Sequence, residues 1–460
     1  MYAPKFCFFC KLQNQVFLQQ TTLITRDNIA GMTKYVELDV RSEIGELEGV
    51  ILHTPGSEVE NMTPENAERA LYSDILNLAV AREEYKQLSG VLGEIAETYQ
   101  VKDLLANVLK NEKAKEEIID KICLMEPQVG IKGNTYCIKD YLLDQDPVEL
   151  ARLLIEGVPL KADNLTKFLS KERYAMRPLH NFFFTRDASM SVLDEVLIGK
   201  MANGVRDRES LIMQAIFDYT PEFKTKTVNP IDNPLVDPNC MIEGGDVLIA
   251  RDDILVIGNG TRTTSQGIDF ILAQLLSQKE KKQRHILVQE LPSHPESFIH
   301  LDMVFTLLDV DKCMIYEPLI VRPNKYQTVH ITIENGKVIN IKRENNLLEA
   351  LKKLGMDLKP IYCGGNNDPW NQEREQWHSG ANFFAVGPGK VVGYGRNIHT
   401  MEAMNKNGFE ILRAKDIIRH KIELSDYEKY VITIEGSELP RGGGGARCMT
   451  MPVRRKPVNW

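Results

Sequence analysis

The chain has 460 residues, of which 43 % are hydrophobic and 26 % charged, the balance of an ordinary globular protein with two or three domains. Its formal net charge of −8 argues against a nucleic-acid partner, because neutralising phosphates requires clustered Lys and Arg. No apolar run reaches about 18 residues, so we expect no membrane-spanning helix and no membrane partner. Eight scattered cysteines suit free thiols in a reducing compartment, which predicts a cytoplasmic location.

Residues 1–31 have no helical or strand period and lack the features of a signal peptide. Met32 begins the segment MTKYVELDVRSEIGELEGVILHTPG, which is typical of the start of a domain. We therefore interpret residues 1–31 as a disordered extension or as the product of a wrong start codon. Cys7 and Cys10 form a lone CxxC, and without a second pair nearby they do not predict a zinc site.

The stretch from Thr63 to about Lys171 is helical in character. Thr63 followed by Pro64 indicates an N-cap with proline at the first helical position. Apolar residues then recur at spacings of three and four, as in ANVLKNEKAKEEIIDKICL and PVELARLLIEGV. We predict an all-helical domain over residues 64–171, inserted into a second domain made of residues 32–63 and 172–460.

After about residue 178 the chain repeats one plan: polar residues, an apolar strand, a short turn and a second strand. Four segments follow it: FTRDASMSVLDEVLIGK, EGGDVLIARDDILVIGN, HLDMVFTLLDVDKCMIY and HSGANFFAVGPGKVVGYGR. Three of them continue into helix-like stretches, RESLIMQAIF, SQGIDFILAQLL and TMEAMNKNGFEIL. A fifth copy can be assembled from GELEGVILHTPG and the C-terminal CMTMPV. Such self-similarity indicates an array of α/β units.

The polar side chains of these units lie at or just before the first strand of each unit. They are Asp187 in the first segment, Glu243 with Asp246 in the second, and His300 with Asp302 in the third. Each residue alone is more commonly a turn or cap residue. If the units pack around an axis like propeller blades, however, equivalent strand ends converge and these groups meet in one pocket. The HxD spacing also predicts that His300 and Asp302 share one face of a strand.

A possible nucleophile stands near the C-terminus, in RGGGGARCMTMPV. Four glycines, Gly442 to Gly445, precede Cys448, and glycines permit close approach of the backbone to a ligand. An isolated cysteine is more commonly a buried, inert side chain. Its position after a glycine-rich loop, at the start of an apolar strand, favours a catalytic thiol.

The ordered set FFFTRD, IEGGD, HLDMVF and CMTMP resembles the arginine deiminase family. The resemblance covers about residue 36 to the C-terminus. It implies a five-bladed α/β-propeller of ββαβ-type units with pseudo-fivefold symmetry, together with the extra helical domain of that family. It also implies hydrolysis of L-arginine to L-citrulline and ammonia, with no cofactor and no metal, in a homo-oligomer.

The same resemblance assigns a catalytic role to five residues. Cys448 resembles the nucleophile and His300 the general acid and base. Asp187 and Asp302 resemble the carboxylates that hold the guanidinium group, and Glu243 the carboxylate that supports the histidine and the substrate.

Four further positions match residues that bind the rest of the substrate. Asn181, Arg206 and Arg262 match positions that hold the α-carboxylate, and Phe184 matches a residue that packs on the aliphatic stem. The chain departs from some family members in two places: Gly443 stands where they have arginine, and Arg447 where they have histidine.

Several alternatives remain open at this stage. An agmatine deiminase, a dimethylarginine hydrolase or an amidinotransferase would use the same thiol, imidazole and carboxylates. A non-catalytic arginine-binding protein, or a structural propeller that binds protein, would retain the repeat without needing Cys448. The polar segment NNDPWNQEREQWHSG (366–380) is interpreted either as a mobile lid or as a surface loop.

Overall fold

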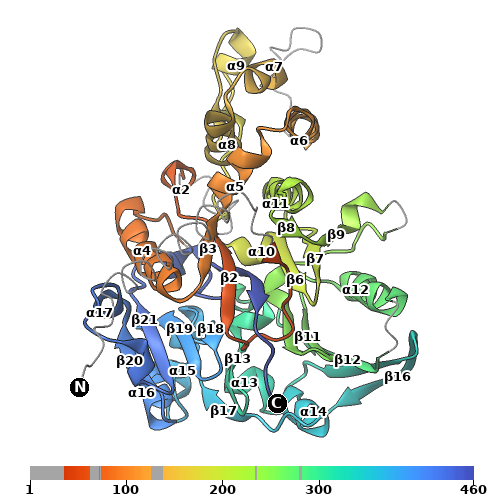
Figure 1. The fold of residues 1–460 in the computed structure, drawn as a ribbon, viewed down its shortest axis with the longest axis vertical. Helices are drawn as coiled ribbons and strands as arrows, with labels where there is room; N and C mark the ends of the chain where they lie inside the picture. Colours follow the sequence, from red (N-terminus) through yellow and green to blue (C-terminus); the bar gives the residue numbers. More distant parts are fainter. Residues whose placement is uncertain (1–35, 63–71, 73, 126–137, 234–235, 279–281) are drawn as a thin grey trace, which may run out of the picture.

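The computed structural model describes residues 36–460 except 63–71, 73, 126–137, 234–235 and 279–281. Three predictions fall on residues outside the described ones. They concern the nature of residues 1–31, the Cys7–Cys10 pair and the helix start at Thr63. The described chain is an α/β protein made of small sheets with helices between their strands (Figure 1). The α/β class expected from the sequence is therefore confirmed.

Five units of the structure share one topology. In each, the first strand pairs antiparallel with the second, and the second pairs in parallel with a third. In order, the strands are β22 (Met451–Arg455), β2 (Leu47–Leu52) and β3 (Glu97–Gln100); β6 (Ser189–Val192), β7 (Glu195–Ile198) and β9 (Lys226–Val228); β10 (Val247–Arg251), β11 (Ile254–Asn259) and β12 (Arg284–Glu290); β13 (Phe305–Asp309), β14 (Lys312–Ile315) and β17 (Lys359–Tyr362); and β18 (Phe384–Gly387), β19 (Lys390–Tyr394) and β21 (Tyr430–Ile434).

Helices connect the second and third strands of each unit, as a parallel pair requires a crossover. They are α4 (Leu78–Ile95), α11 (Asp207–Tyr219), α12 (Ser265–Ser277), α13 (Glu317–Ile320) with α14 (Leu347–Lys353), and α16 (Ile398–Lys406) with α17 (Ala414–Ile418). Additional strands extend two of the sheets: β15 (Thr328–Glu334) and β16 (Lys337–Glu344), and β20 (Glu410–Arg413). β1 (Val36–Glu37) pairs with β8 (Phe223–Lys224).

All four hairpins predicted from the sequence are present, and so is the pair expected from the two ends of the chain. β2, near the start, lies antiparallel to β22, near the end, with Ile51 opposite Met451. The helix-like stretch expected up to Leu412 is wrong in its second half. The helix ends at Lys406, and Gly408 takes a φ of 89°, so the chain turns into β20.

The units follow one another in chain order around the body of the molecule (Figure 1). Each unit contacts the next one. The first unit contacts the second through β22 and β6, and the second contacts the third through the short helices before β6 and β10. The third contacts the fourth through the short helices before β10 and β13, the fourth contacts the fifth through β13 and β18, and the fifth contacts the first through β18 and β2. The last of these contacts joins the end of the series to its beginning. The short helices before the first strands therefore face one another.

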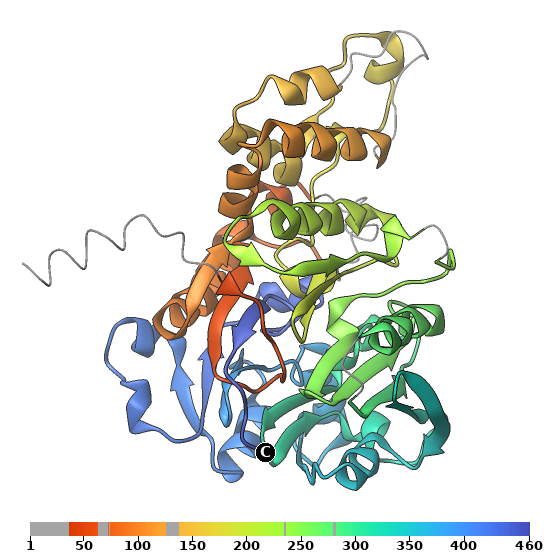
Figure 2. The same ribbon diagram turned by 45° about the vertical axis from the view of Figure 1, so that its right-hand side comes forward.

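A group of helices projects from this body and stands above it in both ribbon views (Figure 2). It contains α5 (Val101–Val108), α6 (Glu112–Met125), α7 (Ile138–Leu143), α8 (Pro147–Glu156) and α9 (Leu165–Phe168), closed by the short pair β4 (Val158–Pro159) and β5 (Tyr174–Met176). The start of α8 shows why this segment is helical. The Asp146 side chain accepts hydrogen bonds from the N–H groups of Val148 and Glu149, and Pro147 takes the first turn.

Residues 97–100 were expected to be helical, and that expectation is wrong. Their sequence, ETYQ, forms strand β3, because Thr and Tyr favour extended backbone and β2 offers a parallel edge. The preceding helix α4 also lies within the predicted helical insert, and it contacts α17 and β21 of the fifth unit. The division of the chain into domains stays a prediction.

The projecting helices share a hydrophobic core with the body. Leu105 of α5 and Leu154 of α8 are buried in one cluster with Ile212 of α11 and Met451 of β22. No helix of the described chain is both long and apolar enough to cross a membrane.

We expect Leu105→Ala to destabilise the protein by about 2–5 kcal/mol, because a fully buried leucine would be replaced by a cavity between α5, α8 and α11. Leu124→Ala is the matched control on α6, since the Leu124 side chain is 87 % exposed and its truncation should change stability by less than about 0.5 kcal/mol. Urea unfolding followed by circular dichroism measures both. Equal midpoints for the two variants would contradict this account of the core.

Candidate functional site

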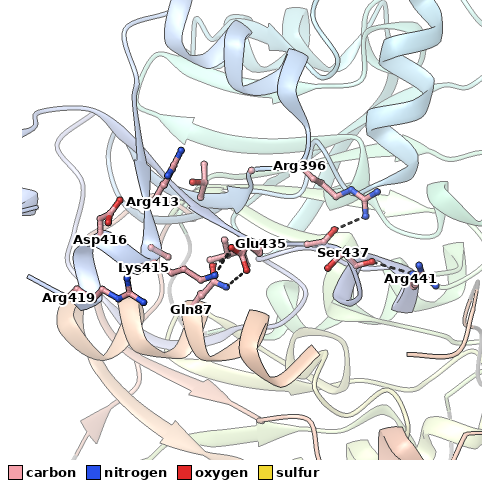
Figure 3. Close-up of a pocket in the computed structure, with 14 residues that line it drawn as sticks. Gln87, Arg396, Arg413, Lys415, Asp416, Arg419, Glu435, Ser437 and Arg441 are labelled. Atoms are coloured by element: carbon pink, nitrogen blue, oxygen red, sulfur yellow. Dashed lines mark hydrogen bonds and ion pairs between the residues drawn. The ribbon is translucent and has the colours of Figure 1, made fainter. Parts of the chain in front are cut away.

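Two hollows in the described structure differ in size and in chemistry. The larger, of about 760 Å³, is lined by the ends of β19 and β21 and by α17, and contains none of the residues predicted to form the site (Figure 3). The narrower one lies against the glycine-rich loop. Its lining contains seven of the nine predicted residues: Asn181, Phe184, Asp187, Arg206, Arg262, His300 and Cys448. The remaining two residues contact members of this lining: Glu243 contacts His300, and Asp302 contacts Cys448.

One-turn helices before the first strands position the polar groups. Asp187 lies on α10 (Thr185–Ala188), Glu243 precedes η3 (Gly244–Asp246), and His300 precedes η5 (Leu301–Met303). The prediction that His300 and Asp302 share a strand face is therefore wrong. The N–H of Leu301 donates to Asp246 Oδ1 at 2.9 Å, which ties this segment to η3 before the strand begins.

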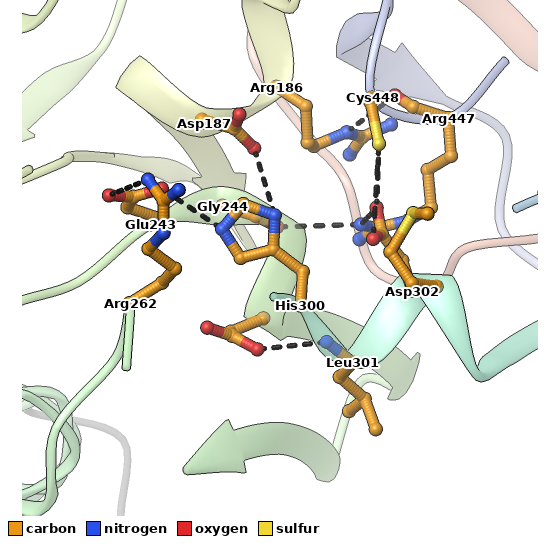
Figure 4. Close-up of polar contacts among 12 residues, drawn as sticks. Arg186, Asp187, Glu243, Gly244, Arg262, His300, Leu301, Asp302, Arg447 and Cys448 are labelled. Carbon is orange, nitrogen blue, oxygen red and sulfur yellow. Dashed lines mark hydrogen bonds and ion pairs between the residues drawn. The ribbon is translucent and has the colours of Figure 1, made fainter. Parts of the chain in front are cut away.

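Cys448 is buried, with its sulfur directed at a carboxylate (Figure 4). Its Sγ lies 3.6 Å from Asp302 Oδ2 and 3.9 Å from Oδ1. Burial raises the pKa of the thiol well above its ordinary value, and the negative charges of Asp302 and Asp187 raise it further. These surroundings favour the neutral thiol of Cys448 at neutral pH.

His300 lies between two carboxylates. Its Nε2 is 3.0 Å from Glu243 Oε2, and its Nδ1 is 3.7 Å from Asp187 Oδ1. Burial alone would lower the pKa of His300, but Asp187 and Glu243 outweigh it and raise the pKa to about 9. The imidazole is consequently protonated at neutral pH. Gly245 makes this packing possible, because a Cβ there would lie 2.4 Å from His300 Nδ1.

Asp302 is held by Arg447. Arg447 donates to Asp302 Oδ2 at 2.9 Å and forms a two-pronged ion pair with Glu43 at 3.0 Å on each side. All three side chains are buried. Burial would raise the pKa of Glu43, but Arg447 and its neighbour Arg186 lower it to about 2. The ion pair thus keeps the Asp302 carboxylate aimed at the sulfur.

The two arginines predicted to bind the α-carboxylate differ in how closely neighbouring carboxylates hold their guanidinium groups. Arg206 donates to Asp187 Oδ2 at 2.8 Å and to Glu209 Oε2 at 2.8 Å and 3.0 Å, and is almost fully buried. Arg262 is less constrained, since its closest carboxylate oxygen, Glu243 Oε1, is 3.5 Å away. Asp187 Oδ1 has no hydrogen-bond partner within the described residues although it is buried.

The glycine-rich loop closes over Phe184 and Cys448. A Cβ on Gly444 would lie 2.5 Å from the Phe184 ring and 3.0 Å from Cys448 Cβ, so only glycine fits there. Gly443 has a φ of 86°, a backbone conformation that favours glycine. Asn181 and Phe184 line the same hollow as the sulfur.

Asn382, which was not predicted from the sequence, also contacts Cys448. Its side-chain N–H₂ lies 3.2 Å from Cys448 Sγ, and its Oδ1 accepts hydrogen bonds from the N–H groups of Arg447 and Cys448 at 2.9 Å and 3.3 Å. Asn382 stands just before β18, at the place that Asp187, Glu243 and His300 occupy in their own units. The repeat therefore contained a signal for this residue.

Asp187, Glu243 and His300 are the one group of the described chain whose donor atoms lie within 4.8 Å of one another, as metal ligands would. Three cations already face these carboxylates: protonated His300, Arg206 and Arg262. Side chains of the protein thus balance the charge of this group.

Segment 366–380 was expected to be a loop, and that expectation is wrong. Residues Pro369–Trp377 form helix α15, which begins because Asp368 caps it and Pro369 takes its first position. Gln376 donates to the carbonyl oxygens of Ser297 at 2.6 Å and Met303 at 3.2 Å. These bonds fix α15 beside the turn that bears Asp302.

Comparison with known proteins decides the family. The family model described as arginine deiminase matches residues 68–455. The chain belongs to the arginine deiminase family. It is 35 % identical over 436 residues to an arginine deiminase of Bacillus cereus and 31 % identical over 432 residues to that of Staphylococcus aureus, each match covering 92 % of this chain and 99 % of the relative. The family and the hydrolase activity predicted from the ordered motifs are confirmed.

A solved structure with the same fold is an amidinotransferase of Microseira wollei from the saxitoxin biosynthetic pathway. It has a TM-score of 0.52 at 13 % identity, with 92 % of this chain and 98 % of the other covered. At that identity the likeness concerns the fold alone.

We expect alkylation of Cys448 by iodoacetamide in the free protein to accelerate with pH and still to be rising at pH 9, because burial and two carboxylates oppose the thiolate. Asp302→Asn should shift the profile to lower pH by removing one of these charges. Mass spectrometry of the Cys448 peptide gives the rates, with the Cys123 peptide as an internal control. A plateau below pH 8 in the unsubstituted protein would contradict the account.

Proposed function

We propose that this protein hydrolyses L-arginine to L-citrulline and ammonia through a covalent intermediate on Cys448. The observation that carries the proposal is the pairing of a buried thiol with carboxylates whose hydrogen-bonding capacity is incompletely used. Cys448 Sγ lies 3.6 Å from Asp302, and Asp187 Oδ1 is buried without a hydrogen-bond partner among the described residues. A planar guanidinium cation supplies the donors that these oxygens lack.

Binding of the guanidinium group orients its central carbon. Asp187 and Asp302 accept hydrogen bonds from its N–H groups, which fixes the plane and presents one face to the sulfur. Holding reacting atoms in this way can lower a barrier by about 7–11 kcal/mol. The bound cation also offsets the negative charges of Asp187 and Asp302, the charges that raise the pKa of the Cys448 thiol. Substrate binding therefore favours the thiolate, and the thiol proton is released to solvent.

The first half of the reaction breaks a C–N bond. The Cys448 thiolate attacks the guanidinium carbon and forms a C–S bond. His300, protonated because its pKa is raised to about 9, donates a proton to the departing nitrogen, which leaves as ammonia. The product of this half is an S-alkylthiouronium bound to the enzyme.

The second half consumes water. His300, now neutral, accepts a proton from a water molecule, whose oxygen attacks the thiouronium carbon. The C–S bond breaks, its electron pair returns to the sulfur, and the hydroxyl proton of the adduct passes to that sulfur, which restores the Cys448 thiol and releases L-citrulline. Glu243, 3.0 Å from His300 Nε2, stabilises the imidazolium in both halves.

The amino-acid end of the substrate is assigned to the other side of the hollow. Asn181, Arg206 and Arg262 bind the α-carboxylate, and Phe184 packs against the methylene groups. The nearly buried Arg206 is oriented by Glu209, whereas Arg262 is free enough to turn toward the ligand. This pair favours L-arginine over agmatine, which has no carboxylate, and a complete catalytic set argues against a purely arginine-binding or structural protein.

We further propose that the five units form a five-bladed α/β-propeller, with residues 64–171 as an inserted helical domain and residues 32–63 and 172–460 as the catalytic domain. Their common topology and the contacts between successive units support the proposal. Location in the cytoplasm and assembly into a homo-oligomer belong to the same proposal. Free cysteines at 240, 313, 363 and 448 agree with a reducing compartment.

The decisive experiment measures citrulline and ammonia release from L-arginine by the purified protein beside its Cys448→Ala variant. We expect equal amounts of both products from the unsubstituted protein and none above background from the variant. Cys313→Ala is the matched control, because Cys313 is equally buried but lies in β14. Turnover that persists in Cys448→Ala would overturn the assignment of the nucleophile.

Arg262→Ala tests the assignment of the α-carboxylate site. We expect it to raise the KM for L-arginine by about one to two orders of magnitude, since a charge-assisted hydrogen bond is worth about 1.5–3 kcal/mol. Any slow turnover of agmatine should change much less. Steady-state kinetics with both substrates measure the contrast, and an equal loss for both would count against carboxylate binding.

A further inference from the structure

The larger hollow has a strongly basic lining in an otherwise acidic protein. Its walls contain five basic and two acidic residues, whereas the formal charge of the whole chain is −8. Figure 3 shows the basic side chains entering from three directions, from the end of β19, from α17 with its preceding residue, and from the segment before the glycine-rich loop. They are Arg396, Arg413, Lys415, Arg419 and Arg441.

Two of these cations have unused hydrogen-bonding capacity. Arg413 and Arg419 form no ion pair or side-chain hydrogen bond with the described residues. Lys415, by contrast, pairs with Glu435 at 2.6 Å, and Gln87 donates to the other oxygen of that carboxylate at 3.0 Å. The acidic side chain in the middle of the hollow is therefore already neutralised, while guanidinium groups beside it are free.

The floor of the hollow is continuous with the loop over the active site. Arg396 donates to the carbonyl oxygen of Gly436 at 2.6 Å. Next to it, the buried Glu84 of α4 accepts hydrogen bonds from the backbone N–H groups of Ser437, Glu438 and Leu439. These residues lead directly into η7 (Leu439–Gly442) and the glycines that line the narrow hollow.

Tyr394 joins the two hollows by contact. Its ring lies against Gly436, where a Cβ would be 2.6 Å from it, and its hydroxyl donates to the carbonyl oxygen of Gly444 at 3.1 Å. Gly444 in turn packs against Cys448 Cβ. One aromatic side chain thus contacts both Gly436, in the lining of the larger hollow, and Gly444, in the loop beside Cys448.

We propose that this basic hollow binds a small polyvalent anion through Arg413, Arg419 and Arg396, and that the bound anion alters the glycine-rich loop through Gly436 and Tyr394. Phosphates and polycarboxylates share the chemistry that guanidinium groups recognise, namely several oxygens that accept paired N–H donors. Binding rests on the geometry of the hollow alone, whereas the effect on turnover rests on the proposed deiminase function.

Isothermal titration calorimetry tests binding, with inorganic phosphate and citrate as separate probes at matched ionic strength. We expect one of them to bind with a stoichiometry of one, and Arg413→Ala/Arg419→Ala to weaken it about tenfold or more. Lys337→Ala/Arg343→Ala removes the same charge from exposed positions of β16 and is the matched control. Binding of neither probe, or equal weakening in both double variants, would overturn the site.

Steady-state kinetics test the coupling with whichever probe binds. We expect the anion to change the KM for L-arginine at least twofold in the unsubstituted protein, and the change to be lost in the Arg413→Ala/Arg419→Ala variant. Tyr394→Phe should retain anion binding and reduce the kinetic change. Bound anion without any change in kcat or KM would refute the coupling. If no citrulline forms under any condition, the proposed function fails, and calorimetry still decides the binding site.

Discussion

The site depends on one buried ion pair, between Arg447 and Glu43. Arg447 directly precedes Cys448 in the chain, and Glu43 precedes β2, the strand that pairs with β22. The same guanidinium also donates to Asp302 and to the carbonyl oxygen of Val247, which belongs to another unit. A single side chain thus ties three sheets together at the point where thiol and carboxylate meet. Removal of either partner would leave an uncompensated buried charge, which is far more costly than loss of an exposed pair.

Opposing electrostatic demands are met in this small volume. The carboxylates of Asp302 and Asp187 disfavour the Cys448 thiolate, whereas Asp187 together with Glu243 keeps His300 protonated. In the proposed mechanism, a cationic ligand offsets the first effect and leaves His300 as a proton donor. That mechanism couples activation of the Cys448 thiol to the arrival of a guanidinium group.

Much of this organisation could be predicted from the sequence, for identifiable reasons. Alternating apolar strands with short polar turns indicated the hairpins, and the polar residues before them indicated where the chemistry lies. The backbone conformation of individual segments was harder to predict from the sequence. The HxD segment is a 3₁₀ turn because Asp246, far away in sequence, captures the N–H of Leu301. Strand β3 exists because β2 offers it an edge. Asn382 was missed because the chain between it and Cys448 gives no local sign that they touch, although the repeat places it in an equivalent position.

The pairing of β2 with β22 has a consequence for folding. The unit that bears Cys448 is completed by segments from opposite ends of the described chain, so its contacts are the most distant in sequence. Contacts of that kind form late, since the entropy of closing a long loop must be overcome first. A chain in which this pairing has not formed keeps Cys448 apart from the acidic side chains and the imidazole of the other units. Any activity that requires Cys448 to meet these groups therefore also reports that the pairing has formed.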